Sequence, residues 1–422
     1  MSETEDEDMD DERITVAREG SAEAAASESR QRSALAALLR IGEPGDGLLR
    51  AVVDAVGPIA TLEIIRAVAA EPVSTGDAAT HLSAEVGEPA AGTQLAEALA
   101  RWAVRSADAD GDHDLEGMLR LGGRLVIPGH DEWPRCLDDL GPAAPLALWV
   151  RGQARLDATL RRAVAVVGAR AASGYGTKCA SDLAWDLGAE GITVVSGGAF
   201  GIDAAAHRAA IARDAPTIAF MAGGVDRFYP AANADLFAQV LNGGAIVSET
   251  APGMTPMRHR FLLRNRLIAA SALVTVIVEA GWRSGALNTA RHALELSRAV
   301  AAYPGSVYSA SSAGTHRLIR HHEAELVTTA ADVLDLLDDD ELPLDFAPAP
   351  DNGSRGDDRL EDLSEREKIC LTSLSATKEL DVGTLAARAG LTVQDTLSAL
   401  ALLELAGLSR RHGSGWTKVR GG

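Results

Sequence analysis

The segment VAVVGARAASGYG at residues 164–176 begins as an apolar, β-branched run and passes through Gly168 into residues suited to a helix. The same pattern returns as ITVVSGGAFGID at residues 192–203. A strand, a glycine-bearing loop and a helix, repeated at this spacing, are typical of a βαβ unit with parallel strands. Further apolar runs predict strands at residues 216–221, 244–249, 273–280 and 299–305. Continuous apolar strands that alternate with helices predict an α/β fold, an extended Rossmann-like, doubly wound and mostly parallel sheet with helices on both faces.

Outside this alternation the composition changes, and it predicts five regions. Residues 1–30 are acidic, rich in Ser and Ala and without hydrophobic periodicity, which is typical of a disordered tail. Apolar residues then recur at three- and four-residue spacing and predict a small helical domain at residues 31–115. The Rossmann-like core domain follows at residues 120–338, and a Pro-, Gly- and Asp-rich linker at residues 339–362. Residues 363–422 combine helix-turn-helix spacing with a hairpin sequence and predict a winged-helix domain.

The formal net charge of −20 is unevenly distributed along the chain. Residues 1–160 carry 30 acidic and 14 basic side chains, whereas residues 161–330 carry 12 acidic and 16 basic ones. The predicted core domain is therefore mildly basic. Because salt screens charges over about 10 Å, a local anion-binding site is compatible with a negative net charge of the whole protein.

The sequence carries no signature of export or of membrane insertion. Its N-terminus lacks the basic and apolar regions of a signal peptide, and its longest apolar stretch, residues 267–278, is shorter than the roughly 20 residues of a membrane-spanning helix. The three cysteines form no CxxC pair and no zinc-ligand spacing. We expect a cytoplasmic protein without a membrane partner, a disulfide or a bound metal.

Two loops of the predicted βαβ unit carry residues suited to an anion. Arg170 follows the first strand, at the carboxyl edge where doubly wound sheets bind ligands. Gly197, Gly198 and Gly201 follow the second strand, where they let the backbone and the N–H groups of the next helix approach an anion closely. Each loop alone is also explained by a surface arginine or by tight strand–helix packing.

A basic cluster follows in MRHRFLLRNRLIAAS at residues 257–271. Its members are Arg258, His259, Arg260, Arg264 and Arg266, with Asn265 between the last two. No acidic residue balances them within the segment, which leads directly into an apolar strand. Because like charges on one helix face repel each other, we expect an external polyanion here in preference to a solvated helix face.

Ser284 stands in the next loop, at the start of a predicted helix. Its hydroxyl suits an N-cap, a phosphate ligand, or both.

Signatures of common enzymes and nucleotide cofactors are missing. The glycine loops do not match GxGxxG, and no P-loop with GKS or GKT occurs, which argues against NAD and ATP. Glu249 and Glu279 both end strands and are conceivable as a catalytic pair. Glu279 is better explained as a residue that orders its loop by accepting backbone hydrogen bonds. We therefore expect no catalytic residue and no cofactor.

Together, these motifs resemble DNA-processing protein A, the DprA or Smf family. The shared sequences between residues 163 and 305 are, in order, GARAASGYG, SGGAFGID, GGVDRFYP, IVSE, RNRLIAA, VEAGWRSGALNTA and YPG. The resemblance implies a Rossmann-like domain that binds single-stranded DNA. It also implies a homodimer that delivers this strand to RecA in natural transformation and recombination.

The resemblance extends to single residues. It implies a dimer-forming surface at Leu318, Ile319, Leu326 and Val327. Relatives place a DNA-contacting lysine after the Tyr-Pro pair, where this chain has alanines, and Arg227 is the candidate to replace it. The complete set of predicted DNA contacts is Arg170, Gly197, Gly198, Gly201, Arg227, Arg258, Arg260, Arg264, Asn265, Arg266 and Ser284.

Two other functions stay open on the sequence. Nucleoside-monophosphate phosphoribohydrolases have a related fold, but their PGGxGTxxE loop is replaced here by EAGWRSGALNTA. A transcription regulator would read DNA through the predicted recognition helix at residues 394–405, which contains no arginine or lysine. We favour a protein-interaction or auxiliary role for that domain.

Overall fold

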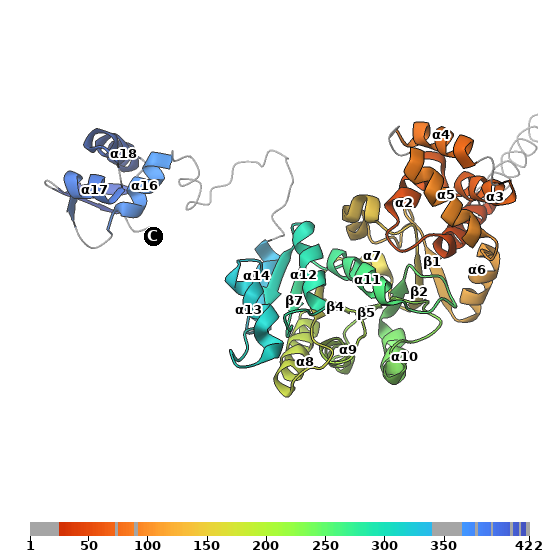
Figure 1. Cartoon of the computed structure of the whole chain (residues 1–422). Coiled ribbons are helices and arrows are strands. Elements are labelled where there is room, and N and C mark those ends of the chain that lie inside the picture. The colour runs from red at the N-terminus through yellow and green to blue at the C-terminus, as the bar shows by residue number, and fades with distance from the viewer. Residues whose placement is uncertain are drawn as a thin grey trace, which may run out of the picture. The chain divides into compact units, whose positions relative to one another are not determined.

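The computed structural model of this chain comprises two compact units, Met1–Leu342 and Pro343–Gly422, which are described separately (Figure 1). The residues that it describes are 25–71, 75–87, 92–339, 365–375, 379–389, 391–405, 408–412 and 415–418. Most of the predicted acidic tail and of the predicted linker lies outside these ranges.

The first unit is built around a nine-stranded sheet with the strand order β1-β2-β6-β5-β4-β3-β7-β8-β9. The strands are β1 (Gly123–Val126), β2 (Leu148–Gly152), β3 (Ala163–Val167), β4 (Thr193–Ser196), β5 (Thr217–Phe220), β6 (Ala245–Ser248), β7 (Val274–Ile277), β8 (Ala299–Ala302) and β9 (Glu325–Leu326). The pairs from β6 to β9 are parallel, while β2 is antiparallel to both β6 and β1. The doubly wound, mostly parallel α/β fold expected from the sequence is confirmed, and each predicted apolar run contains one strand from β3 to β8.

Helices cover both faces of the sheet. They are α7 (Leu156–Thr159), α8 (Gly174–Ala189), α9 (Ile202–Ala212), α10 (Ala234–Gly243), α11 (Arg258–Ala270), α12 (Ala286–Glu295), α13 (Ala313–Arg320) and α14 (Ala330–Asp339). Strand β3 shows why: Val164 and Val166 pack into one buried cluster with α8, α9 and α14, and Ala163, Ala165 and Val167 into another with α11 and α12. Alternate side chains of a strand point to opposite faces, so an all-apolar strand needs cover on both.

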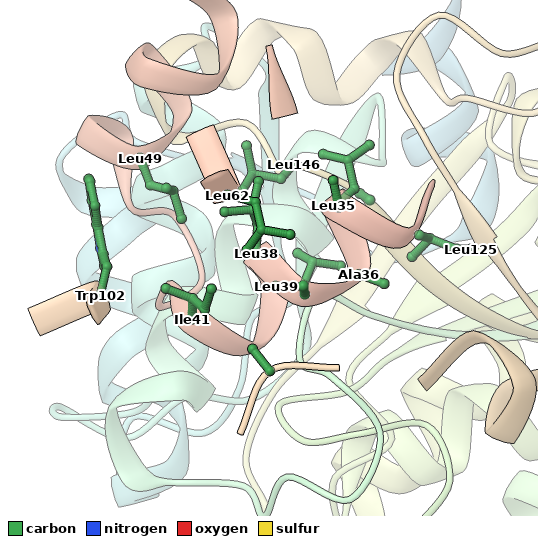
Figure 2. Packing of buried hydrophobic residues seen from close by; sticks show 14 of the residues in the cluster. Leu35, Ala36, Leu38, Leu39, Ile41, Leu49, Leu62, Trp102, Leu125 and Leu146 are labelled. Atoms are coloured by element: carbon green, nitrogen blue, oxygen red, sulfur yellow. The ribbon is translucent and has the colours of Figure 1, made fainter. Parts of the chain in front are cut away.

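Helices also form the N-terminal part of the first unit. Residues 25–41 are helical, followed by α2 (Gly47–Val56), α3 (Pro58–Ala70), α4 (Thr75–Val86), α5 (Gly92–Ser106) and α6 (Gly111–Arg120). Leu38, Leu49 and Trp102 lie in one buried cluster with Leu125 and Leu146 from the start of the core segment (Figure 2). The predicted domains at residues 31–115 and 120–338 therefore share hydrophobic packing, and the boundary between them stays a prediction.

The second unit contains α16 (Glu365–Ser373), α17 (Val382–Ala389) and α18 (Val393–Leu405) with a three-stranded sheet. Its strand order is β10-β12-β11, from β10 (Leu380–Asp381), β11 (Ser409–His412) and β12 (Gly415–Lys418). Leu385, Leu400 and Trp416 are buried in its core. These elements follow the order that the sequence predicts, and the assignment as a winged helix stays a prediction.

Within the described ranges, no helix combines the length and the apolar character needed to cross a bilayer.

Candidate nucleic-acid interface

A groove lies at the point where the strand order reverses, between β3 and β7. Strand β3 pairs with β4 on one side and with β7 on the other, so β3 and β7 mark the topological switch point at which doubly wound sheets bind ligands. A cavity of about 270 Å³ there is lined by the loop after β3, by α11 and by the start of α12. An open depression of about 700 Å³ shares Arg170, Phe261, Leu262, Ser284 and Gly285 with it. We call the two together the switch-point groove.

Exposed arginines line this groove. Arg170, Arg258 and Arg283 all lie on its wall, and none has a carboxylate within 4.0 Å among the residues that the structure describes. The guanidinium of Arg170 lies over the ring of Phe261, 5.3 Å from its centroid, and Tyr229 lies against the same ring at 5.5 Å. The groove thus combines unneutralised positive charge with aromatic surface.

Arg264 reaches the cavity from inside the protein. Its Nη1 donates to the carbonyl oxygens of Gly197, at 2.9 Å, and Phe220, and its Nε donates to Asn265 Oδ1 at 3.3 Å. Burial lowers the pKa of Arg264 to about 10, with the nearby Asp203 opposing this shift and Arg170 adding to it. Arg264 therefore stays charged at neutral pH, but its Nη1 and Nε already donate within the protein, to the glycine loop, to Phe220 and to Asn265.

The glycine loop after β4 is held by side chains rather than left open. Gly197 N–H and Ala199 N–H both donate to Asp203 Oδ2, at 3.1 and 3.3 Å. Gly198 and Gly201 have φ of +64° and +78°, and a Cβ on Gly201 would lie 2.2 Å from a carbonyl oxygen of the β3 loop. Packing alone thus requires glycine here. Of this loop, Ala199 lines the cavity, while contact of the glycines with DNA stays a prediction.

Arg260 and Arg266 are buried and paired, so the expectation of an unbalanced cluster is wrong. Arg266 makes a bidentate ion pair with Glu249, at 2.6 and 2.7 Å, and its Nε donates to the Ala143 carbonyl oxygen. Arg260 makes a bidentate pair with Glu43, at 3.0 and 3.1 Å. Both arginines are 4% exposed. The balancing acids come from distant parts of the chain, which is why the segment itself showed none.

Asn265 connects the two helices that flank the groove, and Ser284 lies just before the second of them. Asn265 Nδ2 donates to the Gly285 carbonyl oxygen and to Asn288 Oδ1, both at 3.2 Å. Ser284 Oγ accepts from the Ala286 N–H at 3.3 Å and also lines the groove, while the N-cap residue of α12 is Gly285. Arg227 is exposed beside Asp226 and is not part of the groove wall.

The two strand-end glutamates belong to separate networks. Glu279 accepts hydrogen bonds from Ser173 N–H at 2.9 Å, Ser173 Oγ at 2.6 Å and Ser311 Oγ at 3.1 Å. Glu279 does accept a backbone hydrogen bond, but it comes from the loop after β3 and not from the loop that follows Glu279 itself. Glu249 is engaged by Arg266, so the two carboxylates do not form a pair.

Comparison with known proteins places this architecture in a family. A family model described as DNA recombination-mediator protein A matches residues 124–338. A protein of Mycobacterium tuberculosis named as a DNA processing protein DprA is 41% identical over 400 residues, which cover 92% of this chain and 95% of the relative. The chain belongs to the DprA family.

Other proteins named DprA or Smf also match this chain. The protein Smf of Escherichia coli is 36% identical over 278 residues, which cover 65% of this chain and 72% of the relative. The X-ray structure of DprA from Streptococcus pneumoniae superposes with a TM-score of 0.56 at 31% identity, covering 71% of this chain and 95% of that one. The family is described as a recombination mediator, a description that names no catalytic reaction.

The residues predicted for a DprA dimer surface do not all reach the surface. Leu318 on α13 and Val327 after β9 are buried in the two core clusters, so neither contributes exposed area to an interface in this structure. Ile319 is partly buried and Leu326 on the edge strand β9 is 51% exposed. The protein's own core therefore uses two of the four side chains that the resemblance assigned to a dimer surface.

Proposed function

We propose that this DprA-family protein binds single-stranded DNA in the switch-point groove. One observation carries the proposal: Arg170, Arg258 and Arg283 line one groove together with Phe261 and lack carboxylate partners among the described residues. Guanidinium groups hold phosphates through paired N–H donors, and aromatic rings stack on unpaired bases. A basic groove with aromatic side chains is the common design for single strands of any sequence.

We further propose that the bound strand is passed to RecA in the cytoplasm, by a homodimer, during recombination and natural transformation. The family description as a recombination mediator supports this role. The edge strand β9 supports the dimer, because its outer side has no neighbouring strand in the described sheet and it carries the exposed Leu326. An uncovered sheet edge is a ready surface for a second chain.

The test is the replacement of Arg170 by alanine in the full chain. We expect the affinity for an oligothymidine to fall about tenfold, and the slope of log K against log salt to fall by about 0.7, the value for one phosphate contact on a single strand. Binding is measured by fluorescence anisotropy at several salt concentrations. Unchanged affinity and slope, or displacement of the oligonucleotide by AMP with release of adenine, would overturn the proposal in favour of a nucleotide-processing enzyme.

A further inference from the structure

The loops after β7 and β8 each expose an aromatic side chain. Trp282, in the loop between β7 and α12, is 63% exposed, and Tyr308, in the loop after β8, is 96% exposed. Exposed aromatic side chains on neighbouring loops are candidates for a ligand-binding surface. Neither residue lines the cavity or the depression described above.

The two loops lie next to each other at one edge of the sheet. Strands β7 and β8 are parallel neighbours, so the loops that follow them leave the sheet at the same edge. A Cβ on Gly281, the neighbour of Trp282, would lie 3.7 Å from the carbonyl oxygen of Ala310. Arg317 on α13 lies over the Trp282 ring, 5.8 Å from its centroid. The loop of Trp282 thus adjoins the loop after β8, and the Trp282 ring itself contacts Arg317 of α13.

Continuity and charge point to what covers this surface. Arg283, the next residue after Trp282, lines the switch-point groove, so the aromatic surface begins where the groove wall ends. Neither Arg283 nor Arg317 has a carboxylate within 4.0 Å in the part of the chain that the structure describes. Positive charge on both sides of an exposed indole suits an anionic ligand with flat, apolar groups, which is the chemistry of an unpaired nucleotide strand.

We propose that Trp282 and Tyr308 form a base-stacking platform that extends the switch-point groove, with Trp282 sandwiched between a nucleobase and the Arg317 guanidinium. The platform rests on the proposed binding of single-stranded DNA, because it receives bases from a strand whose phosphates the groove arginines hold. Stacking acts on bases and not on phosphates. The platform therefore contributes affinity without changing the salt dependence of binding.

The test compares Trp282→Ala with Trp282→Phe on two oligonucleotides of equal length, oligothymidine and a strand of abasic sites. We expect Trp282→Ala to weaken oligothymidine binding about tenfold and abasic binding less than twofold, at an unchanged salt slope. Trp282→Phe retains a stacking ring and should recover most of the loss. Tyr308→Ala should show the same preference for the base-bearing strand with a smaller effect.

Trp185 provides a matched control. It is 43% exposed and carries a stacked arginine, Arg213, at 5.1 Å, as Trp282 carries Arg317. It lies towards the C-terminal end of α8, whose N-terminal end follows the β3 loop, so it belongs to the opposite edge of the sheet. Trp185→Ala should bind both oligonucleotides as the unaltered chain does.

The outcomes separate the platform from the groove. Equal losses of affinity on both oligonucleotides, or no loss with Trp282→Ala, would overturn the proposed platform. Weaker oligothymidine binding by Arg170→Ala would at the same time still support the groove. A change from dimer to monomer in sedimentation velocity, with DNA binding unchanged, would instead assign Trp282 to a contact between protein chains. If the unaltered chain fails to bind oligothymidine, both proposals fail together.

Discussion

The arginines of α11 and the arginines of the loops around it have the same side chain and opposite environments. Arg260 and Arg266 are buried, and each is held by a carboxylate. Arg170 and Arg283 stand in the exposed wall of the groove without such a partner among the described residues. Density of positive charge in a sequence therefore does not identify a nucleic-acid contact. An arginine is available to an external anion only where no other part of the chain brings a carboxylate to its guanidinium.

Three distant segments account for the burial of the α11 arginines. Glu43 comes from the loop before α2, Glu249 from the end of β6, and the Gly197 carbonyl oxygen from the loop after β4. Each pairs with a different arginine of the helix. The helix thereby becomes the fixed rear wall of the groove, while its first residue, Arg258, stays exposed.

The largest effect is expected from breaking the most deeply buried pair. Glu249→Gln should lower the free energy of unfolding by about 3 kcal/mol, because it leaves the Arg266 charge buried and unpaired. Replacing both partners, with Glu249→Leu and Arg266→Met, should recover at least half of that loss, because no buried charge remains. Urea denaturation followed by circular dichroism measures both. A loss below about 0.5 kcal/mol for Glu249→Gln would show that the pair is dispensable.

A smaller and pH-dependent effect is expected at Glu43. Burial by itself raises the pKa of this carboxyl group, but hydrogen bonds from Arg260 and His259 and the nearby charges lower it from 4.5 to about 2. A carboxyl group with a depressed pKa in the folded state stabilises the fold above its unfolded pKa. This stabilisation is lost as the pH falls from about 4.5 through about 2.

Glu43→Gln should therefore cost about 2 kcal/mol at neutral pH and flatten the acid dependence of stability. Urea midpoints measured between pH 7 and pH 3 test this, with Glu116→Gln, an exposed glutamate of α6, as the control. An acid dependence that is the same with and without Glu43 would contradict the assignment.

The smallest effects on stability, and a selective effect on binding, are expected at the exposed arginines. Arg258→Ala and Arg283→Ala should each weaken oligothymidine binding about three- to tenfold while changing the free energy of unfolding by less than about 0.5 kcal/mol. Arg227→Ala is the matched control, because Arg227 is equally exposed but lies outside the groove. If Arg227→Ala weakens binding as much as Arg258→Ala does, the strand follows a path other than the switch-point groove.

The sequence was sufficient to predict the strands of the core sheet, but not which arginines are buried and which are exposed. Strands β3 to β8 are marked by short apolar runs, which is local information that a single sequence carries. The partner of Arg260 lies 217 positions away in the chain, and no local pattern connects the two. Glu249 was visible directly after a predicted strand, but nothing in the sequence linked it to Arg266.

Leu318 and Val327 illustrate the same limit in apolar residues. The resemblance assigned them to a dimer surface, and their local sequence does not say whether the protein's own core or a second chain covers them. Only the packing of α13 and α14 on the sheet distinguishes the two.

The shared core of the N-terminal helices and the sheet sets an order of events during synthesis. Leu38 shares its buried cluster with Ile246 on β6, so the first helix cannot complete its packing until the ribosome has made about two hundred further residues. At the usual 5–20 residues per second this takes roughly 10–40 s. During that interval the apolar faces of α2 to α5 are available to chaperones. The shared core therefore closes only after β6 has been made.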